Sequence, residues 1–155
     1  MDDASAPALA RILVVDDEEH VRRVLQLMLG HQGYEVTTAG NGAEGLEKFA
    51  AEVFDLVILD LRMPDLDGIA VLERIRAAAP DQAVVMITAY ASVETALMAM
   101  KQGAFDYIGK PFKEEEILIV VEKALEHGRM LADNRRLRSE VQSRHDFADI
   151  IGRGQ

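Results

Sequence analysis

"RILVVDDEEH", residues 11–20, decides the fold of this chain. Four apolar residues at 12–15 are followed at once by four acidic residues at 16–19. A short apolar run with a polar boundary is typical of a strand that is covered on both faces in a parallel sheet. Adjacent carboxylates repel one another, so their grouping at the end of a strand predicts a cation among them.

Short apolar runs rich in Val and Ile alternate with longer amphipathic segments along the rest of the chain. The runs predicted to be strands are residues 12–15, 35–39, 56–60, 83–88 and 106–109. The intervening segments carry apolar residues at helical spacing, and a fifth such segment begins near Glu114. This alternation indicates an α/β protein with a parallel sheet. We predict a flavodoxin-like, doubly wound sheet of five strands in the order 2-1-3-4-5, with five helices.

Composition limits the class of protein. The chain has 155 residues, 49% of them hydrophobic, which is enough for one buried core and an appendage. A formal net charge of -10 would repel nucleic-acid phosphates and an anionic membrane surface, so we expect direct binding to neither. Residues 1–10 lack the features of a signal peptide, and no apolar stretch is long enough to span a bilayer. The absence of cysteine fits a cytoplasmic location.

Polar residues stand at the ends of the predicted strands. Asp16 and Asp17 follow the first strand, Asp60 ends the third, Thr88 ends the fourth, and Lys110 follows the fifth. Because parallel strands end at one edge of the sheet, and the first and third are neighbours, we expect the three aspartates to share a pocket. Their oxygens suit Mg²⁺. With a metal bound, one carboxylate can attack a phosphoryl group whose oxygens Lys110 and Thr88 bind.

Several motifs carry a resemblance to a known family. They are "VVDDEE" (14–19), "VILDLRMPDLDG" (57–68), "MITAY" (86–90) and "GKPF" (109–112). In this order and at these intervals they resemble the receiver domain of two-component response regulators, over residues 10–127. The resemblance implies that a sensor histidine kinase phosphorylates Asp60. It also implies that Mg²⁺ is bound by Asp16, Asp17, Asp60 and the backbone carbonyl of Arg62.

The same resemblance implies a switch. Thr88 and Lys110 match the residues that contact the phosphoryl group, and Tyr107 matches an aromatic residue that swings inward when the threonine turns. A cis peptide bond between Lys110 and Pro111 is implied as well. Phosphorylation is expected to bias a two-state equilibrium and to change the contacts of residues 92–112. The domain would catalyse its own phosphorylation and dephosphorylation without being a metabolic enzyme.

The closer resemblance is to the receivers of NtrC-type, sigma-54-dependent activators. It rests on "ITAYASVETALMAMKQGAFDYIGKPF" (87–112) and on "DNRRLRSE" (133–140). "FADIIGRGQ" (147–155) resembles the start of an AAA+ ATPase domain, so the chain is expected to be an amino-terminal fragment of a longer regulator. We expect homodimerisation through the fourth helix, fifth strand, fifth helix and linker to control that output ATPase, and thereby sigma-54-dependent transcription.

The implied organisation has four parts. Residues 1–9 are a flexible amino terminus, 10–127 the receiver, 128–146 a helical linker, and 147–155 the start of the following domain. The linker has two interpretations. Its residues Met130, Asn134, Leu137 and Val141 have the spacing of a short coiled coil. Two heptads fall short of the usual length, so a solvated helix is an equal alternative, and Gly128 is a candidate break in it.

Other interpretations of these residues remain. A phosphatase with an aspartyl-phosphate intermediate would need an Asp-x-Asp motif on the first strand, where this chain has adjacent Asp16 and Asp17. A module that binds without being phosphorylated would not need the complete set of site residues. Asp17 or Glu18 could simply cap the following helix. Asp65 and Asp67 are assigned to the loop and the start of the third helix.

Overall fold

One parallel sheet forms the centre of the structure, a computed structural model that describes residues 10–152 and the side chains up to residue 134. Its strands are β1 (Arg11–Val15), β2 (Glu35–Ala39), β3 (Leu56–Asp60), β4 (Val84–Thr88) and β5 (Asp106–Gly109). The helices are α1 (Glu19–His31), α2 (Gly42–Ala51), α3 (Gly68–Ala78), α4 (Val93–Lys101) and α5 (Glu114–Gly152). The strand order is β2-β1-β3-β4-β5, which confirms the predicted fold.

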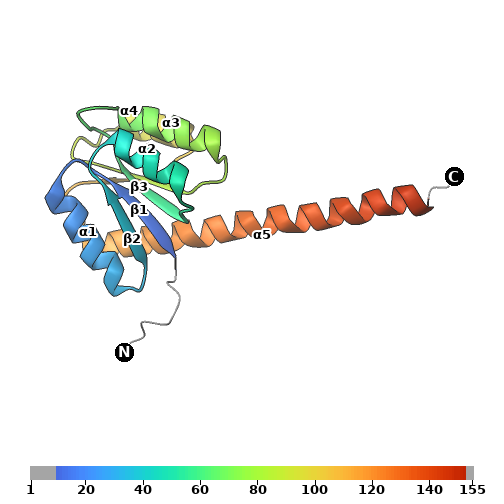
Figure 1. The fold of residues 1–155 in the computed structure, drawn as a ribbon. Coiled ribbons are helices and arrows are strands. Elements are labelled where there is room, and N and C mark those ends of the chain that lie inside the picture. Colours follow the sequence, from blue (N-terminus) through green and yellow to red (C-terminus); the bar gives the residue numbers. More distant parts are fainter. Residues whose placement is uncertain (1–9, 153–155) are drawn as a thin grey trace.

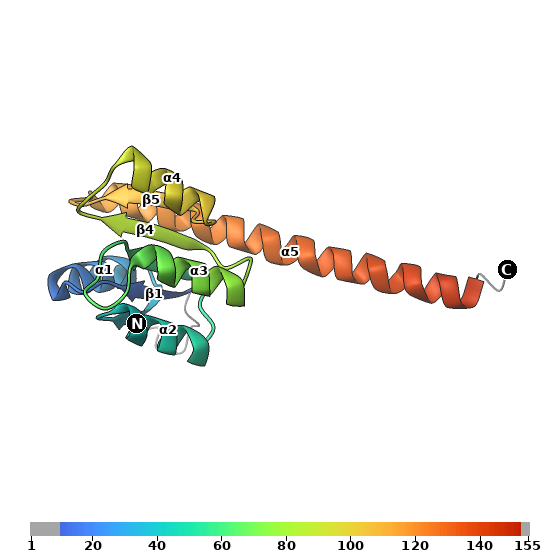
Figure 2. The same cartoon turned by 90° about the horizontal axis from the view of Figure 1, so that it is seen from above.

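Alternate residues of each strand pack into two hydrophobic layers, one on each face of the sheet. Ile12 and Val14 of β1 belong to the layer that α1 and α5 cover. Leu13 and Val15 belong to the layer that contains residues of α3 and α4. Helices α2, α3 and α4 lie side by side over this second face (Figures 1 and 2). The sheet is therefore wound on both faces, as its apolar strands require.

The central strands are the ones whose sequences are continuous apolar runs. Every residue of β3 and β4 is buried, and so are four of the five residues of β1. Strand β2 lies at one edge and has a single buried residue, Ala39. Its polar residues, among them Thr37 and Thr38, are tolerated because solvent reaches this edge.

Helix α5 is the longest element and departs from the prediction at Gly128. It runs without interruption from Glu114 to Gly152, and its second half projects away from the sheet (Figure 1). A side chain at Gly128 would meet no atom within 4 Å, so the glycine faces open space. Glycine in a solvated helix costs only about 1 kcal/mol relative to alanine, which the flanking turns offset. The expected break therefore does not occur.

Several predictions concern residues near the two ends of the chain that the structure does not describe fully. Residues 1–9, expected to be flexible, and 153–155 lie outside the described residues. Residues 147–152 continue the backbone of α5, and their side chains are not described. The proposed boundaries at 127 and 146 remain predictions. Within the described part, no helix is both long and apolar enough to span a membrane.

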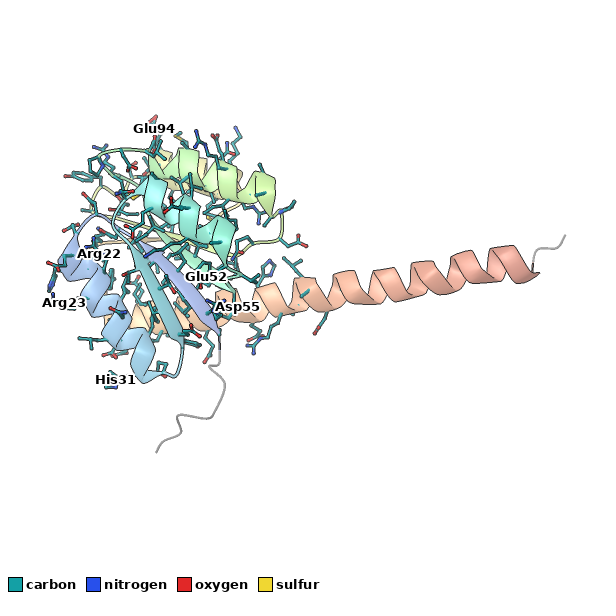
Figure 3. All side chains as sticks on the ribbon, in the orientation of Figure 1. Arg22, Arg23, His31, Glu52, Asp55 and Glu94 are labelled. Carbon is teal, nitrogen blue, oxygen red and sulfur yellow. The ribbon has the colours of Figure 1, made fainter. Side chains whose placement is uncertain are left out.

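Polar contacts fix β1 at the edge where the strands begin. The backbone N–H of Arg11 donates to the Asp55 carboxylate at 2.8 Å, and its guanidinium pairs with Glu52. Figure 3 shows Glu52 and Asp55 together near the start of β1. The Arg11 guanidinium also stacks 5.4 Å from the ring of Phe54. These contacts set the position of β1, whose opposite end carries the acidic residues.

Candidate functional site

Strand pairing brings acidic and basic residues to the carboxyl edge of the sheet. Strands β1 and β3 pair in register up to the residues that precede Asp16 and Asp60, so these two carboxylates are neighbours. Lys110 follows β5, and its backbone N–H donates to the Thr88 carbonyl at 2.7 Å. The predicted convergence of these strand ends is what the parallel topology produces.

Lys110 lies among three carboxylates. Its Nζ is 2.9 Å from Asp16 Oδ2, 2.9 Å from Glu18 Oε1 and 3.6 Å from Asp60 Oδ2. The Lys110 side chain is only 10% exposed, and those of Asp16 and Asp60 are almost completely buried. One buried ammonium therefore offsets the charge of two buried carboxylates and one exposed carboxylate.

Burial and mutual repulsion perturb the ionisation of this group. Burial, followed by the charge of Asp16, raises the pKa of Asp60 to about 7. Burial likewise raises the pKa of Asp16. Burial opposes the charged form of Lys110, but its contacts with Glu18 and Asp16 outweigh this and raise its pKa. The site thus holds more negative charge than Lys110 can neutralise, which favours binding of a further cation.

An open pocket of about 510 Å³ leads to Asp60. The pocket is lined by Asp17, Glu18, Asp60, Arg62, Met63, Pro64, Ala89, Tyr90 and Lys110. The Arg62 guanidinium stacks over the ring of Tyr90 at 4.4 Å from its centre, a cation–π contact at the pocket wall. Asp16 is fully buried and is not among the lining residues. Asp60 is therefore a buried carboxylate that an incoming group can reach.

Comparison with known proteins agrees with this geometry. Residues 12–122 match the response regulator receiver domain family. The chain belongs to this family. The chain is 40% identical over 144 residues to the regulatory protein AtoC of Escherichia coli (strain K12), an alignment that covers 93% of this chain and 31% of AtoC. It is 39% identical over 141 residues to the DNA-binding transcriptional regulator NtrC of the same strain, covering 91% of this chain and 29% of NtrC.

Solved structures show the same fold. NtrX from Brucella abortus, in complex with ATP, superposes with a TM-score of 0.79 at 37% identity, over 83% of this chain and 29% of NtrX. A CheY-like receiver domain protein from Methanospirillum hungatei JF-1 gives a TM-score of 0.76 at 33% identity, over 79% of this chain and 98% of that protein. The present chain thus spans about a third of its regulator relatives and nearly all of a separate receiver domain.

The acidic residues of the receiver fit a hard divalent cation. Oxygens of Asp16, Asp17 and Glu18 lie within 4.8 Å of one another. Asp16 Oδ2 is buried and accepts no hydrogen bond from the described residues, although it forms an ion pair with Lys110 Nζ at 2.9 Å. Mg²⁺ can coordinate a buried carboxylate oxygen that accepts no hydrogen bond and lies among other oxygen donors. The predicted set of Mg²⁺ ligands differs from this group, because it contains Asp60 and the Arg62 carbonyl in place of Glu18. Both Asp60 and Arg62 line the same pocket, and the predicted ligand set stays a prediction.

The two expected switch residues hold other partners in this structure. The Thr88 side chain is fully buried, and its Oγ1 accepts a hydrogen bond from the Tyr90 backbone N–H at 2.9 Å. The hydroxyl of Tyr107 is hydrogen-bonded to the hydroxyl of Thr95 on α4. Neither Thr88 nor Tyr107 lines the pocket beside Asp60. Both would have to change partners to act in the predicted switch.

Asp65 is predicted only to lie in the loop after the third strand, but its side chain also contacts the start of α2. Its carboxylate accepts hydrogen bonds from the backbone N–H groups of Gly42 and Ala43, at 3.0 and 2.9 Å. These are the first residues of α2, so Asp65 ties the loop after β3 to the start of another helix. Asp67 caps α3 by accepting from the Ile69 N–H, which agrees with its assignment to the helix start. Sequence spacing gives no signal for the Asp65 contact, which joins residues 22 and 23 positions apart.

The loop between β3 and α3 is further fixed at Gly68. The Gly68 N–H donates to the Leu61 carbonyl at 2.7 Å and closes the loop. A Cβ at position 68 would come within 2.7 Å of the Leu61 Cα and closer still to the Asp60 carbonyl oxygen. Only glycine permits this approach. On the other side of the pocket the Lys110–Pro111 peptide bond is cis, as the resemblance implies.

Proposed function

We propose that this receiver is a phosphorylation-controlled switch in which Asp60 accepts a phosphoryl group from a sensor histidine kinase. The observation that carries the proposal is the position of Asp60: its carboxylate is buried, opens onto the pocket, and lies 3.6 Å from the Lys110 ammonium. Asp17 is exposed, and Asp16 does not reach the pocket wall. Of the three aspartates, Asp60 is therefore the best placed to act as the nucleophile.

The chemistry follows from the charges around Asp60. Asp16, Asp17, Asp60 and the Arg62 carbonyl would hold Mg²⁺, which neutralises negative charge at the pocket when bound. An Asp60 oxygen attacks the phosphorus, and the bond from phosphorus to the histidine nitrogen of the kinase breaks. Lys110 can then bind a phosphoryl oxygen as a charge-assisted donor. The nucleophile must be ionised, and the Lys110 charge favours that form.

The output would be carried by residues 92–112 and the neighbouring surface of α5. To reach the phosphoryl group, the Thr88 hydroxyl would leave the Tyr90 N–H, and Tyr107 would leave Thr95. This surface is apolar for a solvent-exposed region, since Val93 is 77% exposed, Leu97 is 65% exposed, and Ile119 of α5 is 55% exposed. Such a patch suits a protein partner, here a second copy of the chain. Its change on phosphorylation would alter homodimerisation.

The projecting half of α5 would transmit the change. Residues 128–146 act as a helical linker, either a short coiled coil or a solvated helix, and 147–155 begin an AAA+ output domain. In the whole protein this output ATPase would control sigma-54-dependent transcription in the cytoplasm. The chain itself would not contact nucleic acid, because its net charge of -10 opposes it.

Intact-mass measurement tests the proposed phosphorylation. Wild-type chain and Asp60→Asn are incubated with acetyl phosphate and Mg²⁺, with and without a chelator. The expected result is one phosphoryl adduct on the wild type alone, lost when the chelator removes the metal. Absence of an adduct under all conditions would instead support a module that binds its partner constitutively.

Light scattering tests the proposed dimer. The mass of the chain in solution is measured with and without the phosphoryl group, for the wild type and for Leu97→Lys on α4. The proposal expects the fraction of dimer to change on phosphorylation in the wild type, and the charged variant to lose that response. An unchanged mass in both states would contradict a role for this face in dimerisation.

A further inference from the structure

The nearest partners of Lys110 do not include the proposed phosphoacceptor. Its Nζ is 2.9 Å from both Glu18 Oε1 and Asp16 Oδ2, but 3.6 Å from Asp60 Oδ2. The Glu18 contact also meets hydrogen-bond geometry, at 2.9 Å. The lysine is thus engaged before any phosphoryl group arrives. A phosphoryl oxygen must compete with carboxylates that already hold it.

The Glu18 side chain does not cap the helix that follows it. It occupies the residue before α1, where a carboxylate often accepts a backbone N–H, yet its side chain makes no such capping bond. Its backbone N–H donates to Asp16 Oδ1 at 2.8 Å, which fixes the turn without using the Glu18 side chain. The simple capping interpretation of Glu18 therefore fails, and its carboxylate is directed to Lys110 instead.

The two carboxylates that hold Lys110 differ in accessibility. The Asp16 side chain is fully buried, whereas that of Glu18 is 56% exposed and lines the pocket beside Asp60. An anionic phosphodonor that enters the pocket therefore meets the negative charge of Glu18. Since Glu18 is partly solvated, it can release the lysine at a lower cost than buried Asp16.

We propose that Glu18 is a positioning residue that holds Lys110 in the unphosphorylated receiver and releases it when Asp60 is phosphorylated. This inference rests on the proposed function. In the reaction with acetyl phosphate, a bond forms between an Asp60 oxygen and phosphorus. The phosphorus–oxygen bond to acetate breaks, and acetate leaves with its electron pair. Lys110 stays protonated and exchanges the Glu18 carboxylate for a phosphoryl oxygen.

Removal of the Glu18 charge should therefore speed phosphorylation. In Glu18→Gln and Glu18→Ala, the lysine loses a competing anion, and the pocket loses a charge that repels the donor. We expect the rate constant with acetyl phosphate, at saturating Mg²⁺, to rise on the order of two- to fivefold, the range that one partly exposed ion pair supports. Binding of beryllofluoride, a phosphoryl mimic, should tighten by a similar factor when followed by NMR.

The chain offers a matched control at the next residue. Glu19 carries the same charge, but it pairs with Arg23 within α1 at 3.4 Å and does not contact Lys110. Arg23 lies on the outer side of α1 (Figure 3), and both side chains are at least 69% exposed. Glu19→Gln removes one negative charge near the pocket without freeing the lysine. Its rate should stay within about twofold of the wild type, since an exposed charge is strongly screened.

The outcomes separate the inference from the proposed function. A faster rate and tighter beryllofluoride binding in both Glu18 variants, with Glu19→Gln unchanged, support the positioning role. Equal rates in the wild type, Glu18→Gln, Glu18→Ala and Glu19→Gln, in a receiver that is phosphorylated, overturn the inference alone. A wild type that neither takes the phosphoryl group nor binds beryllofluoride overturns the proposed function and the inference with it. Far-UV circular dichroism confirms that each variant is folded.

Discussion

Asp60→Asn should stabilise the metal-free protein, and the gain should depend on pH. The pKa of Asp60 rises from its ordinary value of 3.8 to about 7 on folding, because the carboxyl is buried beside Asp16. Between these two values the folded state keeps the proton that the unfolded state has released. The free energy of unfolding of the wild type therefore falls as pH rises through this window. The asparagine of the variant does not titrate, so it causes no such fall.

The size of the gain follows from the shift. One pKa unit corresponds to about 1.4 kcal/mol, so the rise of the Asp60 pKa from 3.8 to about 7 gives at most about 4 kcal/mol above pH 7. Asp16 shares the repulsion with Asp60, and part of the gain would come from relief of Asp16. The difference in stability should be small near pH 4, grow through pH 5 and 6, and level off above pH 7.

Urea unfolding followed by far-UV circular dichroism measures this difference, with a chelator present, at intervals from pH 4 to 8.5. Asp67→Asn is the control, because Asp67 is an exposed carboxylate that caps α3 and asparagine caps equally well. A gain for Asp60→Asn that is the same at all pH values, or a loss of stability at pH 8, would contradict a raised pKa of Asp60 in the folded protein. Mg²⁺ at 100 times its dissociation constant should add about 2.7 kcal/mol to the wild type and less to the variant.

Three further substitutions test the surroundings of the site. Gly68→Ala should lower the free energy of unfolding by about 1–3 kcal/mol in urea, since its Cβ would strike the backbone at Asp60; equal stability would contradict that contact. Asp65→Ala should lower the free energy of unfolding by about 1 kcal/mol at pH 7 and by less at pH 3. The two backbone N–H groups that donate to the Asp65 carboxylate lower its pKa, so its contribution to stability is lost when the carboxylate is protonated. Thr95→Val should change the NMR signals of the Tyr107 ring, whose hydroxyl loses its partner; unchanged signals would contradict the contact.

The strands and the convergence of charges could be predicted because both depend on local signals. Each strand ends where an apolar run meets a polar residue, and all strands of a parallel sheet end at the same edge. Asp16, Asp60 and Lys110 could therefore be placed together without knowledge of side-chain positions. The structure shifts the predicted strand starts by one residue at β1 and β4 and leaves these three residues together.

The remaining features depend on side-chain directions that spacing does not encode. Glu18 could equally cap α1 or reach Lys110, and only the backbone conformation before the helix decides between them. The Tyr107–Thr95 contact depends on how α4 is rotated against β5. At Gly128 the low helix preference of glycine made a break a candidate, but this preference is too weak to end a long helix.

The position of the phosphoryl group is the most direct test of the central proposal. Acetyl phosphate and Mg²⁺ are added to the chain, the acyl phosphate is reduced with borohydride to homoserine, and peptide fragmentation by mass spectrometry locates the modified residue. On the central proposal, homoserine is expected at position 60 and at no other aspartate. Homoserine at position 16 or 17, with Asp60 intact, would contradict it.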